Sequence, residues 1–309
     1  MLQLSSPLRY PGSKATLVDW MSTFLDTVGF VGCAFVEPYA GSASLSLGLL
    51  SRGIIGSSML FERDPLLFSF WYSVFNRHEE LIGLIQKYPA DLYTRAELDW
   101  LRHLDCVYND VVLMGFAGLL FNRTSFSGVL HAGPIGGVGQ QSKYKVDCRY
   151  NKGGIIARIR ACAEYADRVT VHFGDALKVL NDASSSDYAG HFFYIDPPYY
   201  VQGPKLYRYH YIFSDHLKLA EVLGAAKYPW ILSYDDHPAI RHLYRRYDVF
   251  EPNLRYSTKV PKIERELILT NIKDRSSELE TKLNIVKPTS RTIESTRDVG
   301  YSATQTDTS

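Results

Sequence analysis

The residues most able to do chemistry are four consecutive ones, Asp196, Pro197, Pro198 and Tyr199, which follow the apolar stretch 191–195. Two prolines in a row fix φ near about −65° and remove two N–H donors, so the turn presents acceptors, namely the Asp196 carboxylate and the Pro197 carbonyl. These acceptors suit an amino group, and the ring of Tyr199 can stack on a heterocycle. Because ligands of open α/β sheets bind beyond the carboxyl ends of strands, we predict a site here rather than only a strand-ending turn.

A second candidate segment, FVEPYAGSA at 35–43, has the pattern of a strand, a tight turn and a helix. Small residues such as Ala40 and Gly41 let a ligand approach the backbone at the positive end of a helix. Packing of a strand against a helix also needs small residues, so this motif is weak by itself.

Acidic residues end two further predicted strands. Glu62 and Asp64 stand at the end of 58–62, and Asp175 follows 168–173. An acidic residue about twenty positions after a small-residue turn can accept a ribose hydroxyl, although a helix cap is the alternative for Asp64. We expect the ends of these strands to face one crevice. Lys14, in the N-terminal sequence RYPGSK, becomes a candidate site residue because it occurs together with these motifs.

Strand and helix patterns alternate along the chain, which predicts an α/β fold with a mostly parallel sheet covered on both faces. Runs rich in β-branched and aromatic residues indicate strands at 33–37, 58–62, 168–173, 191–195, 230–233 and 266–270. Helical spacing indicates helices at 42–51, 65–76, 96–104, 109–120, 154–165, 215–226 and 238–246.

About a hundred residues, 66–167, separate the second and third predicted strands, and their centre, 122–154, lacks a regular period. Long irregular loops in compact domains are usually functional. We therefore divide the chain into a catalytic domain of residues 1–65 and 168–273 and an inserted, largely helical unit of residues 66–167. Residues 274–309 are mostly polar, which predicts a disordered tail.

The composition is that of a folded, water-soluble protein, with 46% hydrophobic residues and a net charge of +1 from 34 basic and 33 acidic residues. The longest strongly apolar stretch, 111–121, is far shorter than the roughly 20 residues of a membrane-spanning helix, and residues 1–10 lack the pattern of a signal peptide. We expect a cytoplasmic protein with no membrane partner. Four cysteines without a CxxC pair predict reduced thiols and no metal site.

Six motifs, RYPGSK, FVEPYAGSAS, FNRTSFSG, FYIDPPYY, WILSYDD and RELILTN, occur in this order. Together they resemble the D12 class of adenine-N6 DNA methyltransferases, the family of the Dam enzymes, over about residues 8 to 272. The resemblance implies S-adenosylmethionine as cofactor, the class I methyltransferase (Rossmann-like) fold, and an insertion that recognises the target. It also implies site-specific methylation of adenine in double-stranded DNA, with a cognate restriction endonuclease left open as a partner.

The same resemblance assigns roles to single residues. It implies a catalytic loop of Asp196, Pro197, Pro198 and Tyr199. It implies cofactor contacts from Tyr10, Lys14, Glu37, Pro38, Ala40, Gly41, Glu62, Asp175 and Asp196, with Lys14 near the cofactor carboxylate, Glu62 at the ribose and Asp175 at the adenine. Two departures are Ala43, where many members have glycine, and the sequence Phe126-Ser127-Gly128, so the recognised target stays open.

An aromatic amine is a poor nucleophile because its nitrogen lone pair is delocalised into the ring, so methylation requires groups that localise this lone pair. Acceptors at Asp196 and the Pro197 carbonyl can bind its two N–H groups and point the lone pair at the methyl group. A base inside a duplex cannot reach this loop, so we expect base flipping, with Tyr199 as a stacking platform. No metal is required. Residues Tyr200, Tyr207, Arg208, Tyr209 and Tyr211 form a segment that we expect to close over the flipped base.

The insertion supplies a locally basic surface, with eight basic and three acidic residues between 119 and 168. Basic side chains in an irregular segment suit phosphate contacts. We expect DNA contacts from Asn122, Arg123, Lys143, Lys145 and Arg149. Methylation of RNA and a catalytically silent DNA-binding relative remain alternatives, while Asp196 disfavours the cytosine-N4 enzymes, which usually carry serine there. The oligomeric state stays open.

Overall fold

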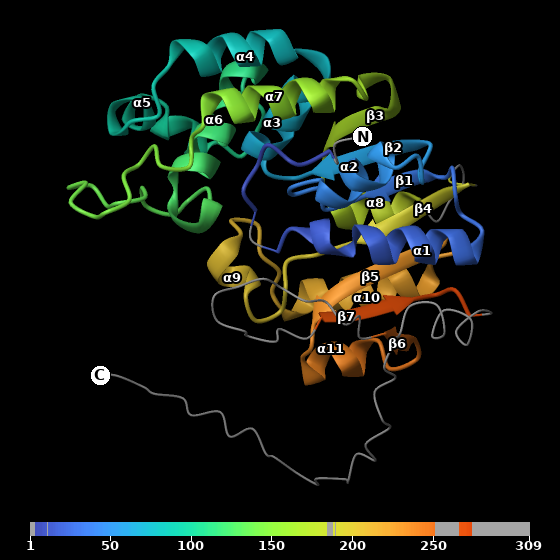
Figure 1. Cartoon of the computed structure of the whole chain (residues 1–309). Coiled ribbons are helices and arrows are strands. Elements are labelled where there is room, and N and C mark those ends of the chain that lie inside the picture. The colour runs from blue at the N-terminus through green and yellow to red at the C-terminus, as the bar shows by residue number, and fades with distance from the viewer. Residues whose placement is uncertain (1–3, 11, 184–187, 189, 251–265, 274–309) are drawn as a thin grey trace, which may run out of the picture.

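The chain folds around one seven-stranded sheet in a computed structural model that describes residues 4–10, 12–183, 188, 190–250 and 266–273. The strand order is β3-β2-β1-β4-β5-β7-β6 (Figure 1). The strands are β1 (Ala34–Glu37), β2 (Ser57–Glu62), β3 (Val169–Phe173), β4 (His191–Ile195), β5 (Trp230–Asp235), β6 (Asp248–Phe250) and β7 (Glu266–Thr270). The predicted tail, 274–309, lies outside the described residues.

The five neighbouring strands β3, β2, β1, β4 and β5 are parallel, which confirms the mostly parallel sheet. Strand β7 runs antiparallel to both β5 and β6. Five consecutive carboxyl ends therefore meet at one edge of the sheet. Because β7 is reversed, its first residue, Glu266, arrives at that same edge, opposite Asp235 at the end of β5.

Helices cover both faces of the sheet, and the alternation of side chains along β4 shows the two layers. Phe192 and Tyr194 pack into one core, with α1 (Val18–Val28), α2 (Ser44–Ser51) and α3 (Pro65–Asn76). Phe193 and Ile195 pack into the other core, with α8 (Ala176–Asp182), α10 (Phe213–Ala225) and α11 (Pro238–Leu243). A strand covered on both faces needs the continuous apolar sequence that β4 has.

In the sequence, five helices separate β2 from β3, and they pack on the β3 side of the sheet (Figure 1). They are α3, α4 (His78–Lys87), α5 (Leu92–Glu97), α6 (Val111–Thr124) and α7 (Lys152–Ala163), with short 3-10 turns between them. Gly115 and Gly118 of α6 lie so close to α3 that an added Cβ would meet a backbone carbonyl oxygen at 2.6 Å. Helices α3 and α6 share the core of the sheet, so the division at residue 66 stays a prediction about function.

Helix α6 extends beyond the predicted end at residue 120, to Thr124, and the irregular segment correspondingly runs from 129 to 151. The 3-10 turn η1 (Lys14–Leu17) precedes the first strand, and the short helix α9 (Gly203–Leu206) follows β4. In the described part of the chain, no helix is long and apolar enough to cross a membrane. The four cysteines are free thiols.

Candidate active site

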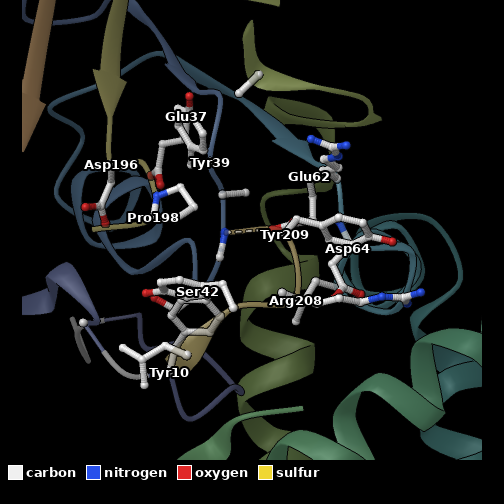
Figure 2. Close-up of a pocket in the computed structure, with 18 of the residues that line it drawn as sticks. Tyr10, Glu37, Tyr39, Ser42, Glu62, Asp64, Asp196, Pro198, Arg208 and Tyr209 are labelled. Atoms are coloured by element: carbon white, nitrogen blue, oxygen red, sulfur yellow. Dashed lines mark hydrogen bonds between the residues drawn. The ribbon is translucent and has the colours of Figure 1, made fainter. Parts of the chain in front are cut away.

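A pocket opens at the carboxyl edge of β1, β2 and β4, with about 1080 Å³ of empty space that includes its mouth. Figure 2 shows Asp196, Pro198 and Glu37 at one end of the pocket and Glu62, Asp64 and Arg208 at the other. All nine residues predicted to contact a cofactor line it, namely Tyr10, Lys14, Glu37, Pro38, Ala40, Gly41, Glu62, Asp175 and Asp196.

The turn after β1 is shaped by Glu37 and Gly41. The buried Glu37 carboxylate accepts a hydrogen bond from the Ser46 backbone N–H at 2.8 Å, which ties β1 to α2. Burial raises the pKa of Glu37 to about 7. Gly41 has φ +47°, and the ring of Tyr10 lies 3.0 Å from the place of a Cβ, so glycine is required there.

Two residues beyond Gly41, the N-cap of helix α2 is Ala43, also in the left-handed region with φ 48°. Left-handed backbone costs an L-residue about 1–2 kcal/mol, which glycine avoids. The departure from the family pattern at Ala43 therefore falls where the backbone itself favours glycine.

The turn after β2 is organised by the Glu62 carboxylate, which accepts hydrogen bonds from the backbone N–H groups of Gly41 at 3.1 Å and Asp64 at 2.9 Å. Burial raises its pKa to about 7. Asp64 caps helix α3 by accepting from Leu66 N–H, as the helix-cap alternative predicted, and burial raises its pKa to about 6. Glu62 thereby joins the ends of β1 and β2 on one side of the pocket.

Asp175 follows β3 and caps helix α8 through Leu177 N–H. Its other oxygen pairs with Arg63 at 2.8 Å, with the two side chains 38% and 53% exposed. An exposed ion pair of this kind contributes little to stability, so Asp175 can exchange its partner for a ligand at small cost.

The catalytic loop is held by the neighbouring strand β5. Asp196 accepts a hydrogen bond from Ser233 Oγ at 3.0 Å, and Asp235 accepts from the backbone N–H groups of Tyr200 at 2.9 Å and Val201 at 3.0 Å. A fifth of the Asp196 side chain stays exposed to the pocket, and burial raises its pKa to about 6. The motif WILSYDD signalled β5, but we assigned no role to Ser233 or Asp235.

Lys14 lies inside the protein, 7% exposed, with its charge directed at protein carboxylates. Its Nζ lies 3.1 Å from Asp196 Oδ2 and 3.2 Å from Glu266 Oε1, and it donates hydrogen bonds to the Gly12 carbonyl at 3.0 Å and the Tyr199 hydroxyl at 2.8 Å. Burial alone would lower the lysine pKa, but Asp196 and Glu266 outweigh it and raise the pKa well above its usual value. Lys14 therefore stays charged and connects the N-terminal turn to the catalytic loop.

Pro197 and Tyr199 are not part of the described pocket lining, whereas Asp196 and Pro198 are. The Tyr199 hydroxyl donates to Glu266, and Lys14 Nζ lies 4.8 Å from its ring centroid. Glu266, 7% exposed, is a residue of this site that sequence reasoning missed, although it belongs to the recognised motif RELILTN.

The aromatic segment 207–211 forms one wall of the pocket. Tyr207 stacks on Tyr10 with ring centroids 5.8 Å apart. Arg208 donates to the carbonyls of Arg102 and Leu104 at 2.9 Å each, which fastens this wall to the insertion. Tyr200 is not part of the pocket lining and stacks on His237. Closure of this segment over a flipped base stays a prediction.

A short stretch of the insertion also lines the pocket, which sequence reasoning did not predict. Gly128, Val129, Leu130 and His131 all face it. Burial, followed by the charges of Arg208 and Arg102, lowers the pKa of His131 to about 4, so this histidine is neutral at pH 7. The insertion therefore contributes to the cofactor pocket as well as to the surface.

Two of the five residues predicted to contact DNA are in the interior, and we correct the expectation for them. Asn122, fully buried, binds the backbone of Arg9 and the carbonyl of Gly128. Arg123, 8% exposed, donates to the Pro7 carbonyl at 2.8 Å. Both fasten the N-terminal segment to α6, because a buried polar group needs such partners. Neither has a surface from which to reach DNA.

The other three residues predicted to contact DNA, Lys143, Lys145 and Arg149, are exposed in the irregular segment. Tyr144, between Lys143 and Lys145, is 56% exposed, and Phe126, earlier in the insertion, is 70% exposed, whereas Tyr150 is buried. In the described part of the chain, no cluster of His, Cys, Asp and Glu could hold a metal ion.

The sheet and its pocket have the arrangement of a class I methyltransferase. A family model described as D12 class N6 adenine-specific DNA methyltransferase matches residues 10–258. The chain therefore belongs to this family, which transfers a methyl group from S-adenosylmethionine to adenine N6 in DNA. The family match confirms the predicted methylation of adenine N6 in DNA with S-adenosylmethionine as cofactor, whereas site specificity and base flipping stay predictions.

No curated protein sequence matches the chain. Among solved structures, it is similar to the putative methyltransferase yhhF from Escherichia coli, with 11% identity, 86% of this chain and 89% of that one covered, and a TM-score of 0.36. It is also similar to the SAM-dependent methyltransferase NGO1261 from Neisseria gonorrhoeae, with 12% identity, coverage of 87% and 76%, and a TM-score of 0.35.

Proposed function

We propose that the chain is a site-specific enzyme that flips its target adenine out of double-stranded DNA and methylates it in the loop at 196–199. The observation that carries this proposal is the position of Asp196, which lies at the end of the pocket with a fifth of its side chain exposed and with Lys14 and Ser233 fixing its two oxygens. A carboxylate held in this way is preorganised to accept an N–H of the incoming amine.

The cofactor would lie along the pocket with its two ends at different strands. We infer that its methionine part lies over Pro38, Ala40 and Gly41, where small residues leave the backbone accessible. Glu62 would accept the ribose hydroxyls, and Asp175 would face the adenine. Lys14 would act near the methionine carboxylate while it stays paired with Asp196 and Glu266, so its contribution to cofactor binding is smaller than that of an unpaired lysine.

During transfer, the chain's own groups orient the amine. Asp196 and the Pro197 carbonyl would accept its two N–H groups, which localises the nitrogen lone pair toward the methyl group. Tyr199 would stack on the flipped base, with its hydroxyl anchored by Lys14 and Glu266. The nitrogen loses its proton after it has bonded to the methyl group, so no strong base is needed.

The proposed function is tested by expressing the chain in a host that lacks adenine methylation and mapping modified adenines in its DNA and RNA. We expect N6-methyladenine at one short sequence in duplex DNA, with none in a matched strain that carries an inactive variant. Methylation confined to RNA would contradict the DNA substrate, and unmodified nucleic acids would indicate a silent relative.

The ribose contact predicts that Glu62→Gln weakens binding of S-adenosylmethionine about tenfold at pH 8, because a hydrogen bond to a charged acceptor is worth about 1.5–3 kcal/mol and one to a neutral acceptor about 0.5–1.5 kcal/mol. The pKa of Glu62 is about 7, so its ionised form dominates above that pH. Wild-type affinity should therefore fall below pH 7 and approach that of the variant. Calorimetric titration at pH 6 and pH 8 measures both, with the exposed Glu221→Gln as control. Equal affinities at pH 8 would remove Glu62 from the ribose site.

The exposed basic residues predict a salt effect on DNA binding. Replacing Lys143, Lys145 or Arg149 by alanine should lower the slope of log affinity against log salt by about one and weaken all duplexes alike, as expected for phosphate contacts. Arg123→Ala should instead reduce stability by about 1–3 kcal/mol, since it leaves the Pro7 carbonyl without its partner. Titrations of duplex DNA across a salt series, with thermal unfolding in parallel, separate the two effects. Unchanged slopes in all three surface variants would remove this segment from the DNA interface.

A further inference from the structure

We propose that Glu266 is a positioning residue for methyl transfer, which shares the charge of Lys14 and so keeps the Asp196 carboxylate from being neutralised by it. This inference rests on the proposed role of Asp196 as the acceptor of the target amine. It gives a function to the motif RELILTN, whose residues the cofactor and DNA sites do not use.

The reversal of β7 explains why this residue can reach the site. A parallel strand would deliver its last residue to the carboxyl edge of the sheet, whereas antiparallel β7 delivers its first. Glu266 pairs in register with Asp235, the residue that holds the backbone of Tyr200 and Val201. The carboxylate therefore reaches the catalytic loop through Lys14 and Tyr199 without being part of the pocket lining.

One lysine charge faces two carboxylates at nearly the same distance. Lys14 Nζ lies 3.1 Å from Asp196 and 3.2 Å from Glu266. A single positive charge cannot neutralise both, so Asp196 keeps part of its negative field toward the pocket. Without Glu266, Lys14 and Asp196 would form an ordinary ion pair, and that field would be largely cancelled.

The reaction needs such a field because positive charge moves toward Asp196. The N6 lone pair bonds to the methyl carbon, the carbon–sulfur bond breaks, and its electron pair stays on sulfur, which becomes a neutral thioether. The positive charge of the sulfonium has then moved to N6, which passes one proton to the Asp196 carboxylate. A carboxylate that is only partly neutralised stabilises this nitrogen better than a full ion pair does.

The pKa of Asp196 depends on how the charge of Lys14 is shared between Asp196 and Glu266. Several titratable groups influence it or are influenced by it, namely Tyr10, Lys14, Glu37, Tyr194, Tyr207, Tyr234 and Glu266, with Tyr199 in contact through Lys14. After burial, the charge of Lys14 lowers the pKa of Asp196 and the charge of Glu266 raises it. Removal of the Glu266 charge therefore lowers the pKa of Asp196, both directly and by freeing Lys14 for it.

The test compares Glu266→Gln with wild type in single-turnover methylation of unmethylated duplex DNA, with saturating labelled S-adenosylmethionine, from pH 5 to pH 9. We expect the plateau rate to fall about tenfold and the acid limb of the pH profile to move down by about one unit. Affinity for the cofactor should stay within about twofold. The exposed Glu221→Gln serves as the matched control and should keep the wild-type profile.

A slower Glu266→Gln enzyme with an unmoved acid limb would mean that Glu266 only supports the fold, and it would overturn the proposal, as would an unchanged rate. If this variant does not fold, Glu266→Asp decides. The aspartate carboxylate is one methylene shorter in reach, so the acid limb of the pH profile should move in the same direction by less. An unmoved acid limb overturns the proposal. Identification of N6-methyladenine as the wild-type product tests the proposed function separately.

Discussion

Asp196→Ala is expected to lower the rate of methyl transfer by about a thousandfold or more while it changes the affinity for S-adenosylmethionine by no more than several-fold. Loss of a preorganised electrostatic group costs about 10²–10³ in rate, and this residue also orients the amine. The affinity changes little because Asp196 lies at one end of the pocket, away from Glu62 and Asp64 (Figure 2).

The measurement pairs single-turnover methylation with calorimetric titration of the cofactor. Asp26→Ala, an exposed aspartate of α1, is the matched control and should behave as wild type. Asp196→Asn adds a second comparison, because it keeps the shape and one acceptor oxygen but not the charge. A fully active Asp196→Ala enzyme would remove the loop from catalysis.

The strands of this fold were largely predictable because their sequences are short, apolar and bounded by turn residues. The predicted strands 191–195 and 266–270 agree with β4 and β7, and the others differ by one or two residues. The three-residue β6 is too short to carry a period. Helices α1, α4, α8 and α9 were not predicted, although α4 buries Leu81, Ile82 and Ile85 on one face. The predicted helix 96–104 covers only the end of α5 and a 3-10 turn at 99–103.

The pocket was predictable for a topological reason. Parallel strands bring their carboxyl ends to one edge, so acidic and small residues after β1, β2, β3 and β4 had to meet there. The partners of Lys14 were not predictable in the same way. Tyr199 is 185 residues away in the sequence, and the contact with Glu266 depends on the reversal of β7, which no local pattern of the sequence specifies.

The predicted DNA contacts of Asn122 and Arg123 were wrong because these polar residues are buried. Asn122 and Arg123 have side chains that are mostly found on surfaces, so their types indicated exposure. The structure pairs Arg123, in the last turn of α6, with the carbonyl of a residue 116 positions earlier, and this hydrogen bond offsets part of the cost of burying the guanidinium. Only the tertiary contact with Pro7 decides between a buried and an exposed arginine here.

The same buried charges predict that Lys14→Met destabilises the protein by about 3 kcal/mol at pH 8, because removal of one partner leaves uncompensated buried charge. Asp196 and Glu266 would then lie side by side without the cation that separates them, at 20% and 5% side-chain exposure. A methionine fills similar space, so the loss reflects the charge rather than a cavity.

The loss should depend on pH in a definite direction. In wild type, the pKa of Asp196 is about 6, above that of an unfolded aspartate, so ionisation of this group already costs stability as the pH rises through 6. Without Lys14 the pKa rises further, so the cost at pH 8 is larger, whereas at pH 5 the carboxyl is protonated in both proteins. The difference between variant and wild type should therefore shrink as the pH falls from 8 to 5.

Urea unfolding of both proteins at pH 8 and pH 5 measures this difference, with the exposed Lys218→Met as the control that should change stability by less than about 0.5 kcal/mol at either pH. Adding Glu266→Gln to Lys14→Met should restore part of the loss at pH 8, since one of the two uncompensated carboxylates is removed with it. A loss of equal size at both pH values, or no recovery in the double variant, would show that Lys14 contributes by packing and not by holding the two carboxylates together.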